Sequence, residues 1–166
     1  MSSDIGVPEP AAAEEGRAKD HASLRLWLRL LACHNLIENR LRNQLRLGFD
    51  TTLPRFDLMA QLARYPEGLK MRDLSRLLMV SGGNVTGLVD RLVEEGLIER
   101  RDDPRDRRAY SVHLTAAGEA SFAGMAEHHE RWVVDLLDGL PADDRARLHD
   151  ILGRLKTHLA TLPPLG

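Results

Sequence analysis

The chain has 166 residues, of which 43% are hydrophobic and 4% aromatic, so we expect one domain with an aliphatic core, alone or with an extension. Its formal net charge of −2 excludes DNA binding driven by the charge of the whole chain, so any affinity for DNA must come from a local basic patch. The single cysteine excludes an intrachain disulfide and a multi-cysteine metal site.

The beginning of the chain carries no pattern typical of a folded element. Residues 1–20 are rich in serine, proline, alanine and glutamate without apolar periodicity, which predicts a disordered tail. They lack the basic-then-apolar pattern of a secretory signal, and no stretch of the sequence is apolar enough to span a bilayer. A cytoplasmic protein with no membrane partner is therefore expected.

A long helix is predicted over residues 22–47. Its apolar residues cover most of the helix circumference: Leu24, Leu26, Trp27, Leu28, Leu30, Leu31, Cys33, Ile37, Leu41 and Leu45. Because a chain this small cannot surround such a helix by itself, the pattern indicates burial by a second subunit. Gly48 stands where a C′ glycine would end the helix.

Three short helices are expected next. The segment 51–54 offers a capping threonine and an early proline for the first helix, and a second helix runs from Met71 to about Met79. A third extends from about Gly83 to Glu95, with Ser81 as its N-cap and Gly96 at its end. One regular stripe marks its buried side: Val85, Leu88, Val89, Leu92 and Val93.

A basic hairpin is predicted after these helices. Residues 100–108 hold five arginines and three aspartates around one proline, between the apolar segments 97–98 and 112–114. An apolar strand, a polar tip with proline and a second apolar strand are typical of a β-hairpin. A helix pair followed by a basic hairpin is a winged helix-turn-helix, which holds DNA.

The C-terminal part of the sequence predicts two more helices, one capped by Thr115 and one beginning near Asp143. The terminal helices carry more apolar surface than one small domain can bury, which favours a symmetric homodimer. We therefore expect a mainly α (α+β) fold, a winged helix-turn-helix with a helical dimerisation region. It divides into a disordered tail (1–20), the helical dimerisation region (21–48 and 117–162) and the DNA-binding lobe (50–116).

Candidate DNA-binding residues lie on the side of the 83–95 helix opposite its buried stripe, and at its start. They are Ser81, Gly83, Asn84, Thr86, Gly87 and Arg91. Asn84 suits an adenine edge and Arg91 a guanine or a phosphate, while the hydroxyls suit phosphate oxygens. Glycines let a backbone approach the groove closely, but they cost helix stability, so an ordinary solvated face is the weaker alternative.

The hairpin tip supplies the second set of candidates: Arg105, Asp106, Arg107 and Arg108. Arginine side chains suit the narrow, negative minor groove, and Asp106 can pair with a neighbouring arginine and orient it. A solvated charge run is the alternative for such a stretch taken alone.

These two segments resemble a known family. Residues 103–109, followed by 112–115 and Gly118, look like the wing signature of the MarR family, and 84–92 with 96–98 resembles its recognition helix. The resemblance covers about residues 22–160 and implies a homodimeric transcription regulator, usually a repressor. Such a dimer binds a pseudo-palindrome in double-stranded DNA and releases it when a small molecule binds. The glycines at 82–83 depart from the bulkier polar residues usual there, and the resemblance leaves both Arg107 and Arg108 as candidates for the minor groove.

The segments 26–33 and 52–60 resemble a subgroup that controls the degradation of aromatic acids. The resemblance implies an aromatic acid or its CoA thioester, such as hydroxycinnamoyl-CoA, as the effector, with no other cofactor. Candidate ligand-binding residues are aromatic, histidine and arginine side chains: Trp27, Arg29, His34, Arg40, Arg55, Phe56 and His129. The aromatic rings are suited to enclosing the effector ring, the histidines to bonding a phenol, and the arginines to pairing with carboxylate or phosphate. Ordinary core and surface roles are the alternatives.

Other functions remain as alternatives. Cys33 would make the chain a redox sensor if its thiol were accessible, although its apolar neighbours favour an inert core cysteine. The adjacent His128 and His129 point apart on a helix and make a poor zinc chelate, so no metal site is expected. The sequence shows no phosphate loop or nucleophile motif, which argues against an enzyme. A protein-interaction module that does not bind DNA is the alternative of another class.

Overall fold

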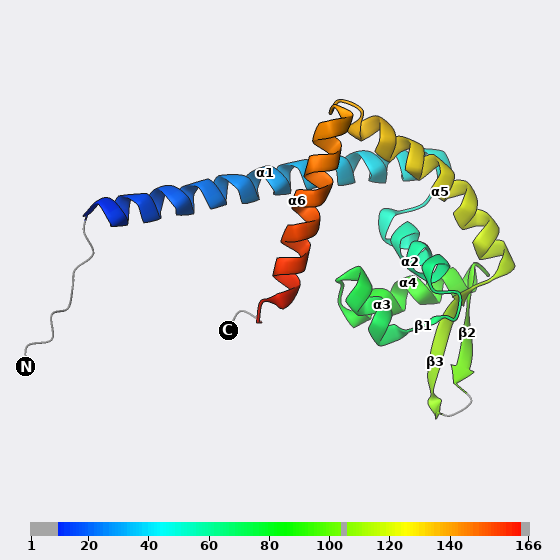
Figure 1. The fold of residues 1–166 in the computed structure, drawn as a ribbon. Helices are drawn as coiled ribbons and strands as arrows, with labels where there is room; N and C mark the ends of the chain where they lie inside the picture. The colour runs from blue at the N-terminus through cyan, green and yellow to red at the C-terminus, as the bar shows by residue number, and fades with distance from the viewer. Residues whose placement is uncertain (1–9, 104–105, 164–166) are drawn as a thin grey trace, which may run out of the picture. The chain divides into compact units, whose positions relative to one another are not determined.

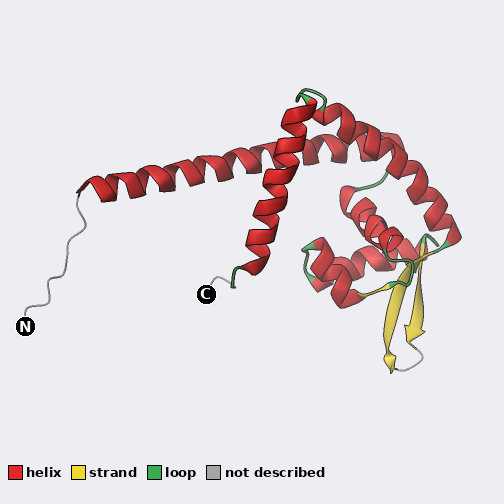
Figure 2. Ribbon diagram, in the orientation of Figure 1, coloured by secondary structure: helices red, strands yellow, loops and turns green. Residues whose placement is uncertain are grey.

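The computed structural model describes residues 10–103 and 106–163, and the side chains of 21–102 and 110–163. The elements in these residues are α1 (Pro10–Phe49), α2 (Leu53–Arg64), β1 (Leu69–Lys70), α3 (Met71–Leu78), α4 (Gly82–Glu94), β2 (Ile98–Asp103), β3 (Asp106–Leu114), α5 (Ala116–Leu137) and α6 (Ala142–Thr161) (Figure 1). The fold is thus mainly helical with one small antiparallel sheet, which confirms the predicted fold class (Figure 2). The chain divides into two compact units, Met1–Arg40 and Leu41–Gly166.

The described residues of the first unit form the beginning of α1. The helix starts at Pro10, so the prediction of a disordered tail was wrong for residues 10–20. Alanine and glutamate dominate that stretch, and their high helix propensity supports a helix without an apolar stripe. The described side chains from residue 21 to 40 are exposed or half-buried, Trp27 among them with 57% of its surface exposed.

The end of α1, which belongs to the second unit, differs from the expectation at Gly48. The helix continues through Gly48 to Phe49, and Asp50 follows with a φ of 49°. Aspartate tolerates this left-handed conformation better than most residues, because its short polar side chain can bond locally. The residue that ends α1 with a positive φ is therefore Asp50 and not Gly48.

The core of the second unit lies between α2, α3, α4 and the sheet. Its most deeply buried side chains are almost all aliphatic, as the composition predicts: Leu45, Leu58, Met59, Leu62, Leu74, Val85, Val89, Leu92, Ile98 and Val112. The strand order is β1-β3-β2, with Ile98 opposite Leu114 and Leu69 opposite Val112. The predicted hairpin is confirmed, whereas the two-residue strand β1 is too short to produce an alternating sequence pattern.

Thr115 joins the hairpin to α5. Its hydroxyl accepts the N–H of Gly118 at 3.0 Å and donates to the carbonyl oxygen of Gly96 at 2.7 Å, so the predicted cap is present. A Cβ on Gly118 would overlap the carbonyl oxygen of Leu97, which explains why only glycine fits in this turn of α5. The last helix, α6, buries none of its residues and exposes apolar side chains: Leu148, Ile151, Leu152 and Leu159.

Candidate nucleic-acid interface

The predicted recognition helix, α4, has one buried side and one open side. Val85, Val89 and Leu92 are fully buried, as the stripe predicts. All six candidate DNA-binding residues of this region are exposed: Ser81, Gly83, Asn84, Thr86, Gly87 and Arg91. The division of the helix into a core side and a solvent side therefore agrees with the sequence.

The residues of this face differ in their hydrogen bonds and in the space around them. Ser81 occupies the N-cap position of α4, but its side chain makes no capping hydrogen bond. The Thr86 hydroxyl donates to the carbonyl oxygen of Gly82 at 3.0 Å, so it is already satisfied within the helix. A Cβ on Gly83 or Gly87 would meet no atom within 4 Å, which shows that internal packing does not require glycine at either position.

The open side of α4 is hollowed. A depression of about 370 Å³ is lined by Pro54, Val80, Gly83, Asn84, Gly87, Leu88 and Arg91. It joins the start of α2, the turn before α4 and the polar side of α4 in one surface, which we call the recognition face. Asn84 and Arg91, two predicted DNA contacts, thus lie together on this surface, whereas Ser81 and Thr86, the predicted phosphate contacts, are not among its lining residues.

An ion pair connects the recognition helix to the hairpin. Arg100 of β2 pairs with Asp90 of α4, and its guanidinium lies 5.3 Å from the centre of the Tyr110 ring. The hydrogen bond to Asp90 raises the pKa of Arg100. Helical periodicity places Asp90 with the solvent-facing residues and does not predict this pair, because the pair depends on how β2 packs against α4.

The tip of the hairpin is described only in part. Arg105 lies outside the described residues, and the side chains of Asp106, Arg107 and Arg108 also lie outside them, although their backbone belongs to β3. The roles predicted for these four residues therefore stay predictions. Arg101 lies nearer the base of the hairpin, where it pairs with Glu99 at 2.6 Å.

Two candidate ligand-binding residues are in direct contact. The rings of Phe56 in α2 and His129 in α5 stack with centroids 4.5 Å apart, and Phe122 lies 5.4 Å from Phe56. Burial lowers the pKa of His129, which favours the neutral imidazole. A second cluster on the same helix joins His128 and Trp132 to Phe49 of α1. The second unit thus contains an aromatic layer between α5 and its neighbours.

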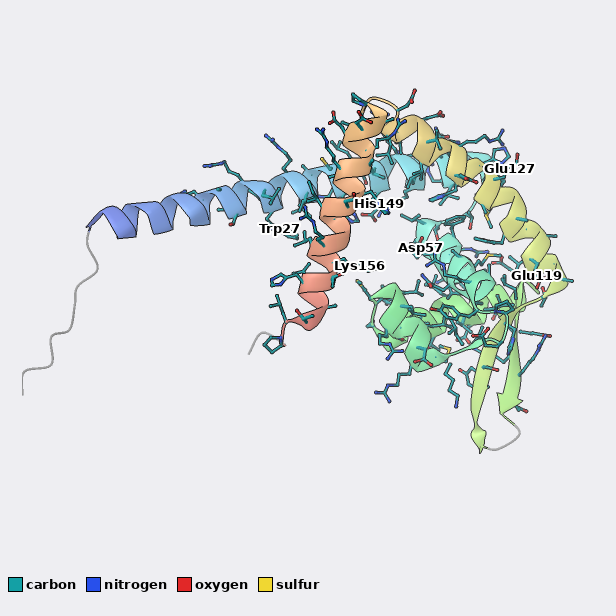
Figure 3. The ribbon with its side chains drawn as sticks, in the orientation of Figure 1. Trp27, Asp57, Glu119, Glu127, His149 and Lys156 are labelled. Carbon is teal, nitrogen blue, oxygen red and sulfur yellow. The ribbon has the colours of Figure 1, made fainter. Side chains whose placement is uncertain are left out.

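Arg55, another ligand candidate, is already paired. Its guanidinium forms a two-pronged ion pair with the carboxylate of Glu95. A separate hollow of about 230 Å³, which the sequence does not predict, includes Arg101, His113, Phe122 and Glu119 in its lining. Glu119 lies near the start of α5, beside the base of the hairpin (Figure 3).

The remaining ligand candidates, Trp27, Arg29, His34 and Arg40, belong to the first unit and are exposed. His34 lies 3.3 Å from Glu38. Cys33 is also exposed in the single chain, because the described residues of the first unit form one helix that encloses no core. Burial of Cys33 as an inert core cysteine by a second subunit stays a prediction.

The chain is similar in sequence and structure to known proteins. A family model described as MarR family matches residues 49–109. The regulator YkoM of Bacillus subtilis is 31% identical over 128 residues, which is 76% of this chain and 80% of YkoM. The chain belongs to the MarR family. A MarR family regulator of Silicibacter pomeroyi with a solved structure is 36% identical, with a TM-score of 0.71 over 84% of this chain and 97% of that one.

Other MarR-type proteins add context. PecS of Dickeya dadantii is 29% identical over 106 residues, which is 63% of this chain and only 64% of PecS. A mutant of MarR from E. coli, solved in complex with operator DNA, shares the fold at 24% identity, with a TM-score of 0.72 over 81% of this chain and 95% of that chain. The MarR-family chain described here is accordingly a transcriptional regulator with a winged helix-turn-helix.

Two negative findings concern the described residues. In the ranges 10–103 and 106–163, no helix is long and apolar enough to cross a membrane. Within the part of the chain whose side chains are described, no group of three or more His, Cys, Asp or Glu residues is arranged to hold a metal ion.

Proposed function

We propose that this MarR-family regulator is a repressor that binds a pseudo-palindromic operator as a homodimer and releases it when an aromatic acid or its CoA thioester binds. The observation that carries the proposal is the recognition face, where exposed Asn84 and Arg91 flank glycines that the packing does not require. Operator DNA in the complex of the E. coli relative supports the same use of the fold here.

The recognition face has the chemistry of a DNA-reading surface. Asn84 can pair with an adenine edge, and Arg91 with a guanine or a phosphate. The ion pair between Arg100 and Asp90 joins the hairpin to α4, so the wing and the recognition helix would approach DNA as one rigid element. The basic tip of the hairpin would then enter the adjacent minor groove with Arg105, Asp106, Arg107 and Arg108.

A homodimer is supported by the apolar surface that a single chain leaves open. Leu24, Trp27 and Leu28 are more than half exposed in the first unit, and α6 exposes Ile151 and Leu159 to a similar degree. Monomeric soluble proteins rarely expose such extended apolar surface, and homo-oligomers with twofold symmetry are the commonest assemblies. Twofold symmetry in the protein would match an inverted repeat in the operator.

An aromatic effector is supported by the stack of Phe56 on His129. Phe56 is buried in the core, so the effector ring would approach the half-buried His129, whose neutral imidazole can bond a phenolic hydroxyl. The arginines Arg29 and Arg40 in the first unit remain proposed partners for a carboxylate or a CoA phosphate. A redox response through the thiol of Cys33, which is exposed in the single chain, is the second candidate, and it requires that the homodimer leave this thiol accessible.

A gel shift on the chain's own promoter fragment tests this function. The wild-type chain is titrated with p-coumaroyl-CoA, free p-coumarate, CoA alone and hydrogen peroxide, with Arg91→Ala as the DNA-binding control. Release by the thioester or the free acid supports the proposed effector class, and release by peroxide that Cys33→Ser abolishes supports the redox alternative. Failure to shift any DNA at low salt contradicts the proposal and favours a protein-interaction module.

A further inference from the structure

Met79 ends α3 in a backbone conformation that favours glycine. Its φ is 54° and its ψ is 35°, which is the left-handed region. Its N–H bonds to the carbonyl oxygen of Arg76 at 3.3 Å, and the N–H of Val80 bonds to that of Ser75 at 3.2 Å. This is the hydrogen-bond pattern of a Schellman motif, whose C′ position usually holds glycine because a Cβ is strained there.

The Met79 side chain gains little within the protein in return for this strain. It is 92% exposed, the largest exposed fraction among the large apolar residues of the described chain. The chain uses glycine for the positive φ at Gly68 and Gly96, and the short polar Asp50 at the end of α1. Met79 therefore has a strained backbone and an apolar side chain in water. Too little of the side chain is covered for packing inside the protein to offset the strain and the exposure.

The position of Met79 connects it to the recognition face. It lies in the turn between α3 and α4, and the next residue, Val80, lines the recognition face together with Asn84 and Arg91. In a helix-turn-helix the start of the recognition helix enters the major groove. The exposed apolar turn is thus continuous with the surface that meets DNA in the proposed function.

We propose that Met79 contacts DNA, and that its target is the C5-methyl group of a thymine in the major groove. The thymine methyl is the apolar group that the major groove presents, whereas a thioether against a phosphate would remove water without returning a hydrogen bond. Methionine is unbranched and adapts its shape to such a contact. This inference rests on the proposed function, since it requires that the chain bind operator DNA.

The test uses the full chain and an operator that the wild type selects from random duplexes. Each thymine is then replaced singly by deoxyuridine, which lacks only the methyl group, and the dissociation constants are measured. We expect the wild type to lose about fivefold in affinity at one thymine of each half-site. Met79→Gly should bind the unmodified operator about fivefold more weakly and show no response to that replacement.

Asp50→Gly is the matched control, because it relieves a positive φ at the end of α1, outside the segment between α3 and α4. It should keep the wild-type affinity and the wild-type response to deoxyuridine. The thermal midpoint of Met79→Gly should equal or exceed that of the wild type, so weaker binding is not a folding defect.

Two results would overturn the inference while leaving the proposed function intact. One is a wild type that binds every deoxyuridine operator as tightly as the parent operator. The other is a Met79→Gly variant that keeps the wild-type affinity and thymine response. If the wild type selects no sequence and binds no duplex, the proposed function itself fails, and the role of Met79 fails with it.

Discussion

The guanidinium of Arg55 in the first turn of α2 binds both carboxylate oxygens of Glu95 at the end of α4. Nη1 donates to Oε1 at 2.7 Å, and Nη2 donates to Oε2. The hydrogen bond raises the pKa of Arg55 and lowers the pKa of Glu95. The pair connects the recognition helix to α2. The residue after Arg55 in α2, Phe56, stacks on His129.

Reversing this pair tests whether it orients the recognition helix. Arg55→Glu or Glu95→Arg alone places like charges together, and each should lower the free energy of unfolding by about 1 kcal/mol, because Glu95 is 44% exposed and water screens the pair. Each should also weaken operator binding relative to random DNA. The double swap should restore both quantities in denaturant titrations and DNA titrations; a double swap no better than the singles contradicts this orienting role.

His129 should make stability depend on pH. Burial lowers its pKa in the folded chain, so the unfolded chain binds more protons as the pH falls through about 6.5 towards the folded pKa. We therefore expect the fold to be less stable at about pH 5.5 than at about pH 7.5. His129→Phe, which keeps a ring against Phe56, should reduce that difference in thermal melts. His149→Gln, at a side chain that is 90% exposed, should behave as the wild type, and equal slopes in all three proteins would refute the assignment.

Replacement of glycine by alanine should raise the thermal stability at some positions of the chain and lower it at another. Gly87→Ala should raise the thermal midpoint by about 2–4 °C, since alanine stabilises a helix by about 1 kcal/mol over glycine and its Cβ meets no atom within 4 Å. It should also weaken operator binding if the backbone approaches DNA there. Gly124→Ala on α5, where an added Cβ also meets no atom within 4 Å, is the control for stabilisation without an effect on DNA binding. Gly118→Ala should instead strongly destabilise the fold, because its Cβ would overlap the carbonyl oxygen of Leu97.

The wing and the recognition helix should contribute differently to DNA binding. Removing the charge of Arg107 or Arg108 should weaken binding to all duplexes and reduce the salt slope by about one for each phosphate that is no longer neutralised. Asn84→Ala should instead relax the preference at particular base pairs and leave the salt slope unchanged. Arg131→Ala on α5 is a matched control for the removal of an exposed arginine. Identical effects of the wing and helix variants across sequences would contradict this division.

The outline of the fold follows from local sequence signals. The stripe of Val85, Val89 and Leu92, the cap at Thr115 and the basic hairpin each depend on residues close together in the chain, and all three appear in the structure. Other local signals misled. Residues 10–20 form a helix rich in alanine and glutamate although they lack an apolar stripe, and α1 continues past Gly48, which was predicted to end it. Ser81 occupies the N-cap position of α4 without a capping hydrogen bond.

The family, the helical periodicity and the order of the elements other than β1 could be predicted from the sequence, because periodicity, caps and turns are short-range properties. Tertiary packing was needed to establish which charges pair and which rings stack: Arg55 with Glu95, Arg100 with Asp90, and Phe56 with His129. It was also needed to identify Met79 as a strained, exposed residue, which composition cannot indicate. These relationships join segments distant in the chain or depend on a backbone angle, so they are fixed only when the elements pack together.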